Sequence, residues 1–303
     1  MLTRFALPLT VLATLLAACA HGGDVDPTES SGDAVAGARA DAHDSGVVAL
    51  RADGSPLCTG VLVGPRLILS SRACVTGMKP NDCPHPGPVG PPDPTAQQDR
   101  DPSTIEIVTG ENVTNVKAAA RGFHVTYPTS THVCGADIAL LEIDQSLPGA
   151  TPMKVALDTI SGGEKLRVIG FGLRKTGGPD GRKASKRGLL VGAVSATEFT
   201  VPTSACQGDE GGPAIDEHTG RVVGVVSRAV GDCSAPDAFA IFTRADAFPS
   251  LLHRVIEGGT GGASGTGGTT GAAGASGKTC SAAHHCPKHH HCNKATHVCE
   301  AVP

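Results

Sequence analysis

The sequence has no tryptophan and only one tyrosine, and aromatic residues make up 3% of its 303 residues. A hydrophobic core must therefore be built from aliphatic side chains rather than from large rings. An excess of basic charge is also absent, because 25 Lys and Arg residues stand against 29 Asp and Glu residues, for a formal net charge of -4. This balance gives no general attraction to nucleic acid or to an anionic membrane surface. We therefore expect no nucleic-acid partner, and we expect no cofactor.

The apolar run at the N-terminus, residues 5–18, is too short to span a bilayer. It follows an early arginine and ends in small residues before Cys19, a pattern typical of a secretory signal. Residues 16–19 resemble the lipobox of bacterial lipoproteins, in which the cysteine is lipidated and becomes the new N-terminus. The alternative is an ordinary cleavable signal with an incidental cysteine. We expect residues 1–18 to be a signal peptide and the exported chain to be lipid-anchored through Cys19 to the bacterial cell envelope, at the outer membrane or the periplasmic face.

Glycine and proline are abundant, with 40 and 22 residues, so much of the chain must be loop or linker. Residues 19–44 are small and polar without an apolar period, which predicts a flexible tether. Residues 258–278 consist mainly of Gly, Ser, Thr and Ala and predict a linker with a mean span on the order of 25 Å. Two units remain, a main domain over residues 45–257 and a Cys- and His-rich module over residues 279–303.

The main domain alternates short apolar runs with turn residues. These runs include VVALRADG, GVLVGPRLILS, STIEIVTG, ADIALLEID, KLRVIGFG, RGLLVGAVSA, GRVVGVVSR and DAFAIFT. Short runs rich in Val, Ile and Leu, separated by Gly, Pro, Asp and Asn, predict an all-β sandwich or barrel. Apolar residues at helical spacing over 248–256, followed by Gly258, predict one closing helix.

Four motifs of the main domain occur in a fixed order: CTGVLVGPRLILSSRAC, GADIALLEID, CQGDEGGPAI and GRVVGVVSRAVGDC. In this order they resemble the chymotrypsin and trypsin family of serine proteases, over about residues 35–256. The resemblance implies two six-stranded antiparallel β-barrels and a C-terminal helix, here followed by a flexible linker and a small disulfide-rich tail. It also implies two disulfides, Cys58 with Cys74 and Cys206 with Cys233.

The chemistry of this family needs a serine nucleophile, a histidine base and a buried carboxylate that orients the histidine. The resemblance places the carboxylate at Asp137, but it places Ala73 at the histidine position and Glu210 at the serine position. Shifting the first motif by one residue replaces Ala73 with Arg72, which stays protonated and cannot act as a base. Because losing one triad member costs on the order of 10⁴ to 10⁶ in turnover, we expect an inactive homologue.

The resemblance assigns Gly208 and Asp209 to the oxyanion loop, and Ser204 and Ser227 to the substrate pocket. The uncharged Ser204 argues against recognition of Lys or Arg, and the pocket is either open to neutral groups or filled by its own side chains. In the family, a cut frees an apolar N-terminus that pairs with the carboxylate at the Asp209 position. The matching segment, residues 34–37, follows an aspartate rather than Lys or Arg. We therefore expect the oxyanion loop to be loosely ordered, or Asp209 to have another partner.

Two interpretations of Glu210 stay open. Asp137 and Glu210 as paired carboxylates would serve acid and base roles or hold a cation. Alternatively, Glu210 is solvated or is paired with Arg72 or Arg228.

The chain has 11 cysteines, and removing the lipidated one leaves an even number, as an oxidising compartment favours. Cys83 and Cys134 are paired by elimination, which would fasten the proline-rich stretch 78–103 beside Asp137. Four cysteines lie in the tail among six histidines: Cys280, Cys286, Cys292 and Cys299. We expect two disulfides there, with their connectivity open and with no metal; zinc binding through Cys, or weak metal capture by His, is the alternative.

These observations together predict an exported, lipid-anchored pseudoprotease that acts as a binding or regulatory module for an unknown protein or peptide ligand. The alternatives are an active secreted hydrolase of the serine endopeptidase family with a non-standard site, or metal or ligand capture by the Cys- and His-rich tail.

Overall fold

The fold is given by a computed structural model. The structure describes residues 38–52, 55–76, 83, 100–130, 132–172, 181–202, 205–232, 235, 237–258, 290–293 and 298–301. The chain divides into two compact units, Met1–Gly261 and Gly262–Pro303. The signal peptide, Cys19, the linker, Ser204, Cys233, Cys280 and Cys286 lie outside the described residues.

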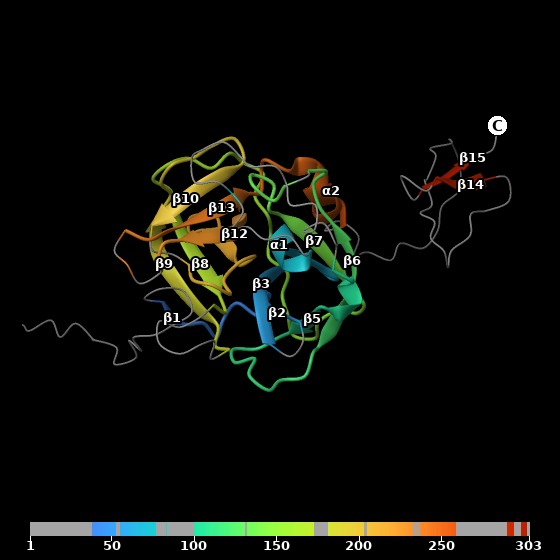
Figure 1. Cartoon of the computed structure of the whole chain (residues 1–303), viewed down its shortest axis with the longest axis horizontal. Helices are drawn as coiled ribbons and strands as arrows, with labels where there is room; N and C mark the ends of the chain where they lie inside the picture. Colours follow the sequence, from blue (N-terminus) through green and yellow to red (C-terminus); the bar gives the residue numbers. More distant parts are fainter. Residues whose placement is uncertain are drawn as a thin grey trace, which may run out of the picture. The chain divides into compact units, whose positions relative to one another are not determined.

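The first half of the main unit is a closed six-stranded antiparallel barrel in the order β2-β3-β4-β7-β6-β5 (Figure 1). Its strands are β2 (Val47–Ala52), β3 (Ser55–Gly64), β4 (Leu67–Ser70), β5 (Glu106–Val108), β6 (Ala120–Thr126) and β7 (Ala139–Ile143). The inward side chains are aliphatic, as the scarcity of aromatic residues requires, and Leu50, Leu62, Ile68 and Leu141 are almost completely buried. This barrel is as the sequence predicts.

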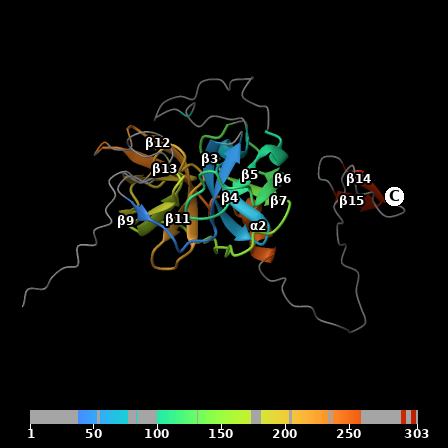
Figure 2. The same ribbon diagram turned by 90° about the horizontal axis from the view of Figure 1, so that it is seen from below.

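The second half is a seven-stranded antiparallel sheet in the order β1-β9-β8-β11-β12-β13-β10. Its strands are β1 (Arg39–Ala40), β8 (Lys165–Gly170), β9 (Ala184–Leu190), β10 (Glu198–Pro202), β11 (Pro213–Asp216), β12 (Val222–Val230) and β13 (Phe239–Arg244). Figures 1 and 2 show this sheet beside the closed barrel. Its core contains a stacked pair of rings, Phe199 and Phe242, with centroids 5.0 Å apart. The all-β fold is confirmed, but among the described residues this half is a seven-stranded sheet rather than the expected second closed six-stranded barrel, with β1 as the added strand at its edge.

Strand β1 lies inside the segment that the sequence predicts to be a tether. It pairs antiparallel with β9. The following residues, Asp41 and Asp44, contact the partly buried guanidinium of Arg167. The Arg167 Nη1 atom lies 3.5 Å from Asp41 Oδ2, and its Nη2 donates to Asp44 Oδ1 at 3.0 Å. Lys183 donates to the Asp44 carbonyl at 2.6 Å. We call Asp41, Asp44, Arg167 and Lys183 the N-terminal cluster, and its ion pairs hold this segment against the sheet.

The helices of the main unit are short: α1 (Arg72–Val75), the 3₁₀ helix η2 (Pro102–Thr104) and α2 (Pro249–Gly258). The closing helix α2 is confirmed; its Leu252 is fully buried in the core, with Leu251 beside it. Within the described residues, no helix has the length and apolar character that crossing a membrane requires.

Disulfides join the loops around the first barrel. Cys58 in β3 is bonded to Cys74 in α1, and Cys83 is bonded to Cys134, so both pairs are as the sequence predicts. Cys206 is also disulfide-bonded, while its expected partner lies outside the described residues. In the second unit, β14 (His290–Asn293) and β15 (Val298–Ala301) form an antiparallel hairpin.

Candidate functional site

Asp137, which precedes β7, is fully buried where the two halves of the main unit meet. Its Oδ1 atom accepts a hydrogen bond from the backbone N–H of Ala73 in α1 at 2.8 Å. Its Oδ2 atom accepts from the Ser227 hydroxyl in β12 at 2.7 Å. Burial raises the pKa of Asp137 to about 6, although both bonds and the nearby charge of Arg228 act to lower it. The expected buried carboxylate is therefore present, with a backbone amide and a hydroxyl as its donors.

A chain of polar contacts leads from Asp137 to the surface. Arg228 Nη1 donates to the Ser227 hydroxyl at 3.2 Å and to Glu198 Oε1 at 2.8 Å. The family resemblance places Ser227 in the substrate pocket, but this side chain has no exposed surface and donates a hydrogen bond to Asp137. Arg228 directly follows Ser227 in the motif GRVVGVVSRAVGDC, yet only its position beside Asp137 reveals it as a counter-charge.

Arg72 does not approach Glu210 as an ion-pair partner. Its guanidinium lies 4.1 Å from the centroid of the Tyr127 ring, and its Nη1 donates to the Ser130 carbonyl at 2.8 Å. Its Nε atom is buried and has no hydrogen-bond partner among the described residues. The alternative in which Arg72 neutralises Glu210 therefore finds no support in the geometry.

The Glu210 side chain instead turns back on its own loop. Its Oε2 atom accepts a hydrogen bond from the Gly208 N–H at 2.5 Å. Burial raises the pKa of Glu210, against hydrogen bonds from its own N–H and that of Gly208, and the charge of Asp137 raises it further. Within the described parts of the chain, neither Arg72 nor Arg228 forms an ion pair with this carboxylate. The Glu210 carboxylate thus accepts its hydrogen bonds from backbone N–H groups of its own loop.

Asp209 has backbone donors as well. It is fully buried, and its two carboxylate oxygens accept hydrogen bonds at 2.8 Å from Gly172 N and Cys206 N. Burial raises its pKa well above the ordinary value, and the charge of Glu210 acts in the same direction. Because a Cβ atom at Gly170 would lie 1.9 Å from Asp209 Oδ1, only glycine fits beside this carboxylate. Of the two expectations for this loop, that of another partner for Asp209 agrees with the structure.

Thr59 of β3 fastens the loop to the first barrel. Its N–H donates to the Glu210 carbonyl at 2.8 Å, and its hydroxyl donates to the Gly208 carbonyl at 2.9 Å. The same hydroxyl accepts from the Phe171 N–H at 3.1 Å. The oxyanion loop is therefore held by neutral hydrogen bonds from both halves of the main unit. Nothing in the motifs signals this role, because Thr59 lies 149 positions from Gly208 in the sequence.

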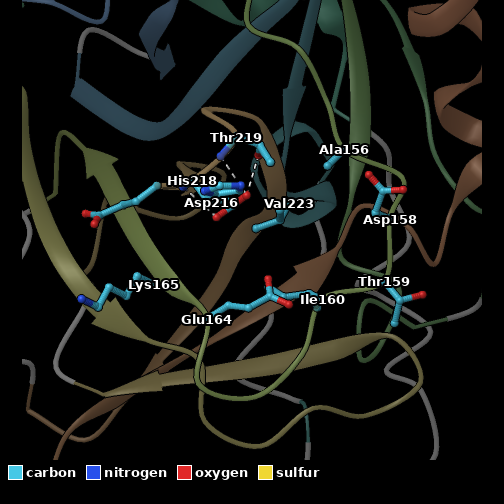
Figure 3. Close-up of a pocket in the computed structure, with 11 residues that line it drawn as sticks. Ala156, Asp158, Thr159, Ile160, Glu164, Lys165, Asp216, His218, Thr219 and Val223 are labelled. Carbon is cyan, nitrogen blue, oxygen red and sulfur yellow. Dashed lines mark hydrogen bonds between the residues drawn. The ribbon is translucent and has the colours of Figure 1, made fainter.

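A separate pocket of about 590 Å³ is lined by both apolar and charged residues (Figure 3). It is lined by Ala156, Asp158, Thr159, Ile160, Glu164, Lys165, Asp216, Glu217, His218, Thr219 and Val223. Figure 3 shows the backbone of His218 and Thr219 folded around the Asp216 carboxylate, which accepts from both N–H groups at 3.0 and 3.1 Å. These bonds organise a turn between β11 and β12. The described residues contain no cluster of three or more His, Cys, Asp or Glu side chains that would hold a metal ion.

Comparison with known proteins agrees with this architecture. The family model described as Trypsin matches residues 34–252, which is more than half of the chain. The chain belongs to the trypsin family. Serine protease SP24D of Anopheles gambiae is 28% identical to this trypsin-family chain over 123 residues, or 34% of this chain and 44% of that protein. The chain thus aligns with less than half the length of this curated relative.

Among solved structures, a mutant of human heparin binding protein resembles the trypsin-family chain. The TM-score is 0.58 at 17% sequence identity, and the match covers 75% of this chain and 99% of that chain. At this identity the likeness concerns the fold alone.

Proposed function

We propose that this trypsin-family chain is a pseudoprotease, exported and lipid-anchored, that acts as a binding or regulatory module at the cell envelope. The observation that carries the proposal is the pair of contacts around Asp137 and Glu210. Asp137 accepts from the backbone N–H of Ala73 where a catalytic carboxylate would hold an imidazole, and Glu210 accepts from Gly208 N–H where a nucleophile would face its substrate.

The surrounding groups do not supply a substitute base or nucleophile. The Ser227 hydroxyl is fully buried and already bonded to Asp137. Asp137 itself has no exposed surface, so a water molecule has no access to it for activation. The Glu210 carboxylate places negative charge beside the N–H groups that would stabilise an oxyanion, which opposes the transition state of acyl transfer. The trypsin-family scaffold would then serve to bind a protein or peptide ligand without cleavage.

Fluorophosphonate labelling tests inactivity directly, because the reagent reacts with an activated serine. We expect no labelling of the native chain and labelling of the double variant Ala73→His with Glu210→Ser, which restores the missing base and nucleophile. The single variant Glu210→Ser, which has the serine but no base, is the matched control and should stay unlabelled. Covalent modification of the native chain would overturn the proposal.

The anchor rests on the lipobox-like residues 16–19 and has its own test. Cells expressing the full chain are grown with an alkyne fatty acid, and the tagged lipid is detected after fractionation. We expect lipid on the native chain in the membrane fraction, and neither lipid nor membrane retention for Cys19→Ser. Equal lipid labelling of both chains would exclude Cys19 as the site.

A further inference from the structure

The Gly208–Glu210 contact closes a small ring within the oxyanion loop. The donor N–H and the acceptor side chain are two residues apart, and the Gly208 N to Glu210 Oε2 distance is 2.5 Å. The Glu210 N–H is a second donor to the same carboxylate. Two N–H groups of one loop therefore share an anionic ligand that belongs to the loop itself.

The backbone is shaped for this role before any ligand binds. Gly208 has a φ of 99°, in the left-handed region that favours glycine, and such a turn directs successive N–H groups into one concavity that attracts anions. Thr59 fixes the two carbonyl groups on either side, through bonds of 2.9 Å to Gly208 O and 2.8 Å to Glu210 O. Because these groups are held by the barrel, the concavity does not depend on the Glu210 side chain for its shape.

The backbone N–H groups of Gly208 and Glu210 are also good hydrogen-bond donors to a carboxylate. Hydrogen bonds from N–H groups to a charged oxygen are shorter and stronger than those between neutral groups. The charge of Asp137 acts against a further anion, so an anion is retained here by local N–H donors and not by a cation. An external carboxylate would have to compete with a side chain that is already covalently in place, whose effective concentration is high.

We propose that the N–H groups of Gly208 and Glu210 form a carboxylate-binding site that the Glu210 side chain occupies as a built-in ligand. The inference rests on the proposed function in that no substrate acyl group uses these donors. Because the Glu210 side chain fills the site in the native chain, ligands of the native chain bind elsewhere. Shortening this side chain opens the site to small external carboxylates.

The test observes the Gly208 amide in ¹H–¹⁵N NMR spectra of the ¹⁵N-labelled full chain, titrated with sodium acetate against sodium chloride at equal ionic strength. We expect a saturable shift of this resonance in Glu210→Ala and no shift in the native chain. Glu217→Ala is the matched control, because Glu217 also accepts a glycine N–H bond, from Gly188 at 2.9 Å. In that variant the Gly208 resonance should behave as in the native chain.

A native Gly208 amide that responds to acetate as Glu210→Ala does would overturn the proposal, and so would a folded Glu210→Ala chain without any response. A second variant keeps the proposal testable if Glu210→Ala folds poorly. In Glu210→Gln a neutral oxygen replaces the charged acceptor, so the Gly208 proton should move upfield; an unchanged resonance contradicts the internal contact. Fluorophosphonate labelling of the native chain would sink the proposed function but not this result, so the two failures are distinguishable.

An independent observation in the second unit concerns the cysteines of the tail. In the hairpin of β14 and β15, Cys292 and Cys299 occupy directly opposed register positions. Opposed residues of an antiparallel pair have Cα atoms about 4.5 to 5.5 Å apart, within the range that a disulfide spans. We infer a Cys292–Cys299 disulfide, which leaves Cys280 and Cys286 to pair with each other. The two thiols lose two protons and two electrons to the disulfide of an exported thiol oxidoreductase, which is reduced to two thiols.

Non-reducing tryptic digestion resolves this pairing, because lysines at 278, 288 and 294 separate the cysteines. We expect peptide 289–294 linked to peptide 295–303, and peptide 279–288 carrying an internal disulfide. A link from 279–288 to either of the others would refute the pairing. Alkylation of Cys292 and Cys299 in the native chain, which indicates free or metal-bound thiols, would refute it as well.

Discussion

Two groups of buried carboxylates in the main unit have opposite surroundings. In the N-terminal cluster, Asp41 and Asp44 contact the cations of Arg167 and Lys183. Burial acts to raise the pKa of Asp41, but hydrogen bonds from Asp44 and Ser185 and the charge of Lys183 outweigh it, and the pKa is lowered. Hydrogen bonds, followed by the charge of Lys183, therefore keep the pKa of this buried carboxylate below its ordinary value.

Around Asp137, by contrast, the carboxylates of Asp137, Asp209 and Glu210 accept mainly neutral hydrogen bonds. Burial outweighs these bonds, and the pKa of each group is raised. Around Asp137 the hydrogen bonds from N–H and hydroxyl groups do not compensate the loss of water, whereas at Asp41 the hydrogen bonds and the charge of Lys183 together do. Electrostatic contacts stabilise the fold in the N-terminal cluster. Around Asp137, burial destabilises the charged form of each carboxylate.

The largest expected effect comes from removing the shared cation of the N-terminal cluster. Arg167→Leu leaves Asp41 and Asp44 buried without their guanidinium, and breaking a buried pair in this way costs about 3 to 5 kcal/mol. Urea unfolding of the native chain and the variant measures the loss. Arg66→Leu is the control, since the Arg66 side chain is 44% exposed and 3.8 Å from Glu142, and it should cost about 1 kcal/mol or less. Equal losses in both variants would remove the distinction between the two regions.

A smaller effect distinguishes the two regions by its dependence on pH. Because the pKa of Asp137 is about 6 in the folded chain against an ordinary 3.8, the folded state keeps a proton that the unfolded state releases. Its stabilising contribution is complete below about pH 4 and is lost as pH rises through about 6, by about 3 kcal/mol at most. Asp41, with its lowered pKa, contributes with the opposite sign and loses its contribution as pH falls through that pKa.

Asp137→Asn isolates this contribution, because the amide has nearly the same shape and does not titrate. The free energy of unfolding is measured at pH 4.5 and pH 7.5 for both chains. We expect the native chain to lose more stability over this interval than the variant. Identical changes in the two chains would mean that Asp137 is charged throughout, and the contrast between the regions would fail.

The sequence predicts the overall fold well because its signals are local. Apolar runs of β2, β7, β8, β12 and β13 are long enough to identify each strand, and the amphipathic segment before Gly258 identifies α2. Strands β6, β10 and β11 were not predicted. The apolar runs of EFTVP and PAID are too short to identify a strand, and these segments become strands by pairing with neighbours. Strand β1 was also not predicted, because its two residues become a strand only by pairing with β9, which is distant in sequence.

For the site, motif order identifies Asp137 as the buried carboxylate, and its complete burial agrees with that assignment. The contacts of Asp209 with Gly172 and of Glu210 with Gly208 were not predictable, because the first joins separate loops and the second depends on a side-chain rotamer. Ser227 was assigned to a pocket because a motif fixes its place along the strand but not the face on which its hydroxyl lies.

Hydrolysis of a neutral peptide ester by the purified full chain tests the central claim most directly, since esters are far easier to cleave than amides. We expect a rate equal to that of buffer alone for the native chain and also for Asp137→Asn and Glu210→Gln. Turnover by the native chain that either substitution abolishes would contradict it, because a working proton-transfer group would then exist where the geometry provides none.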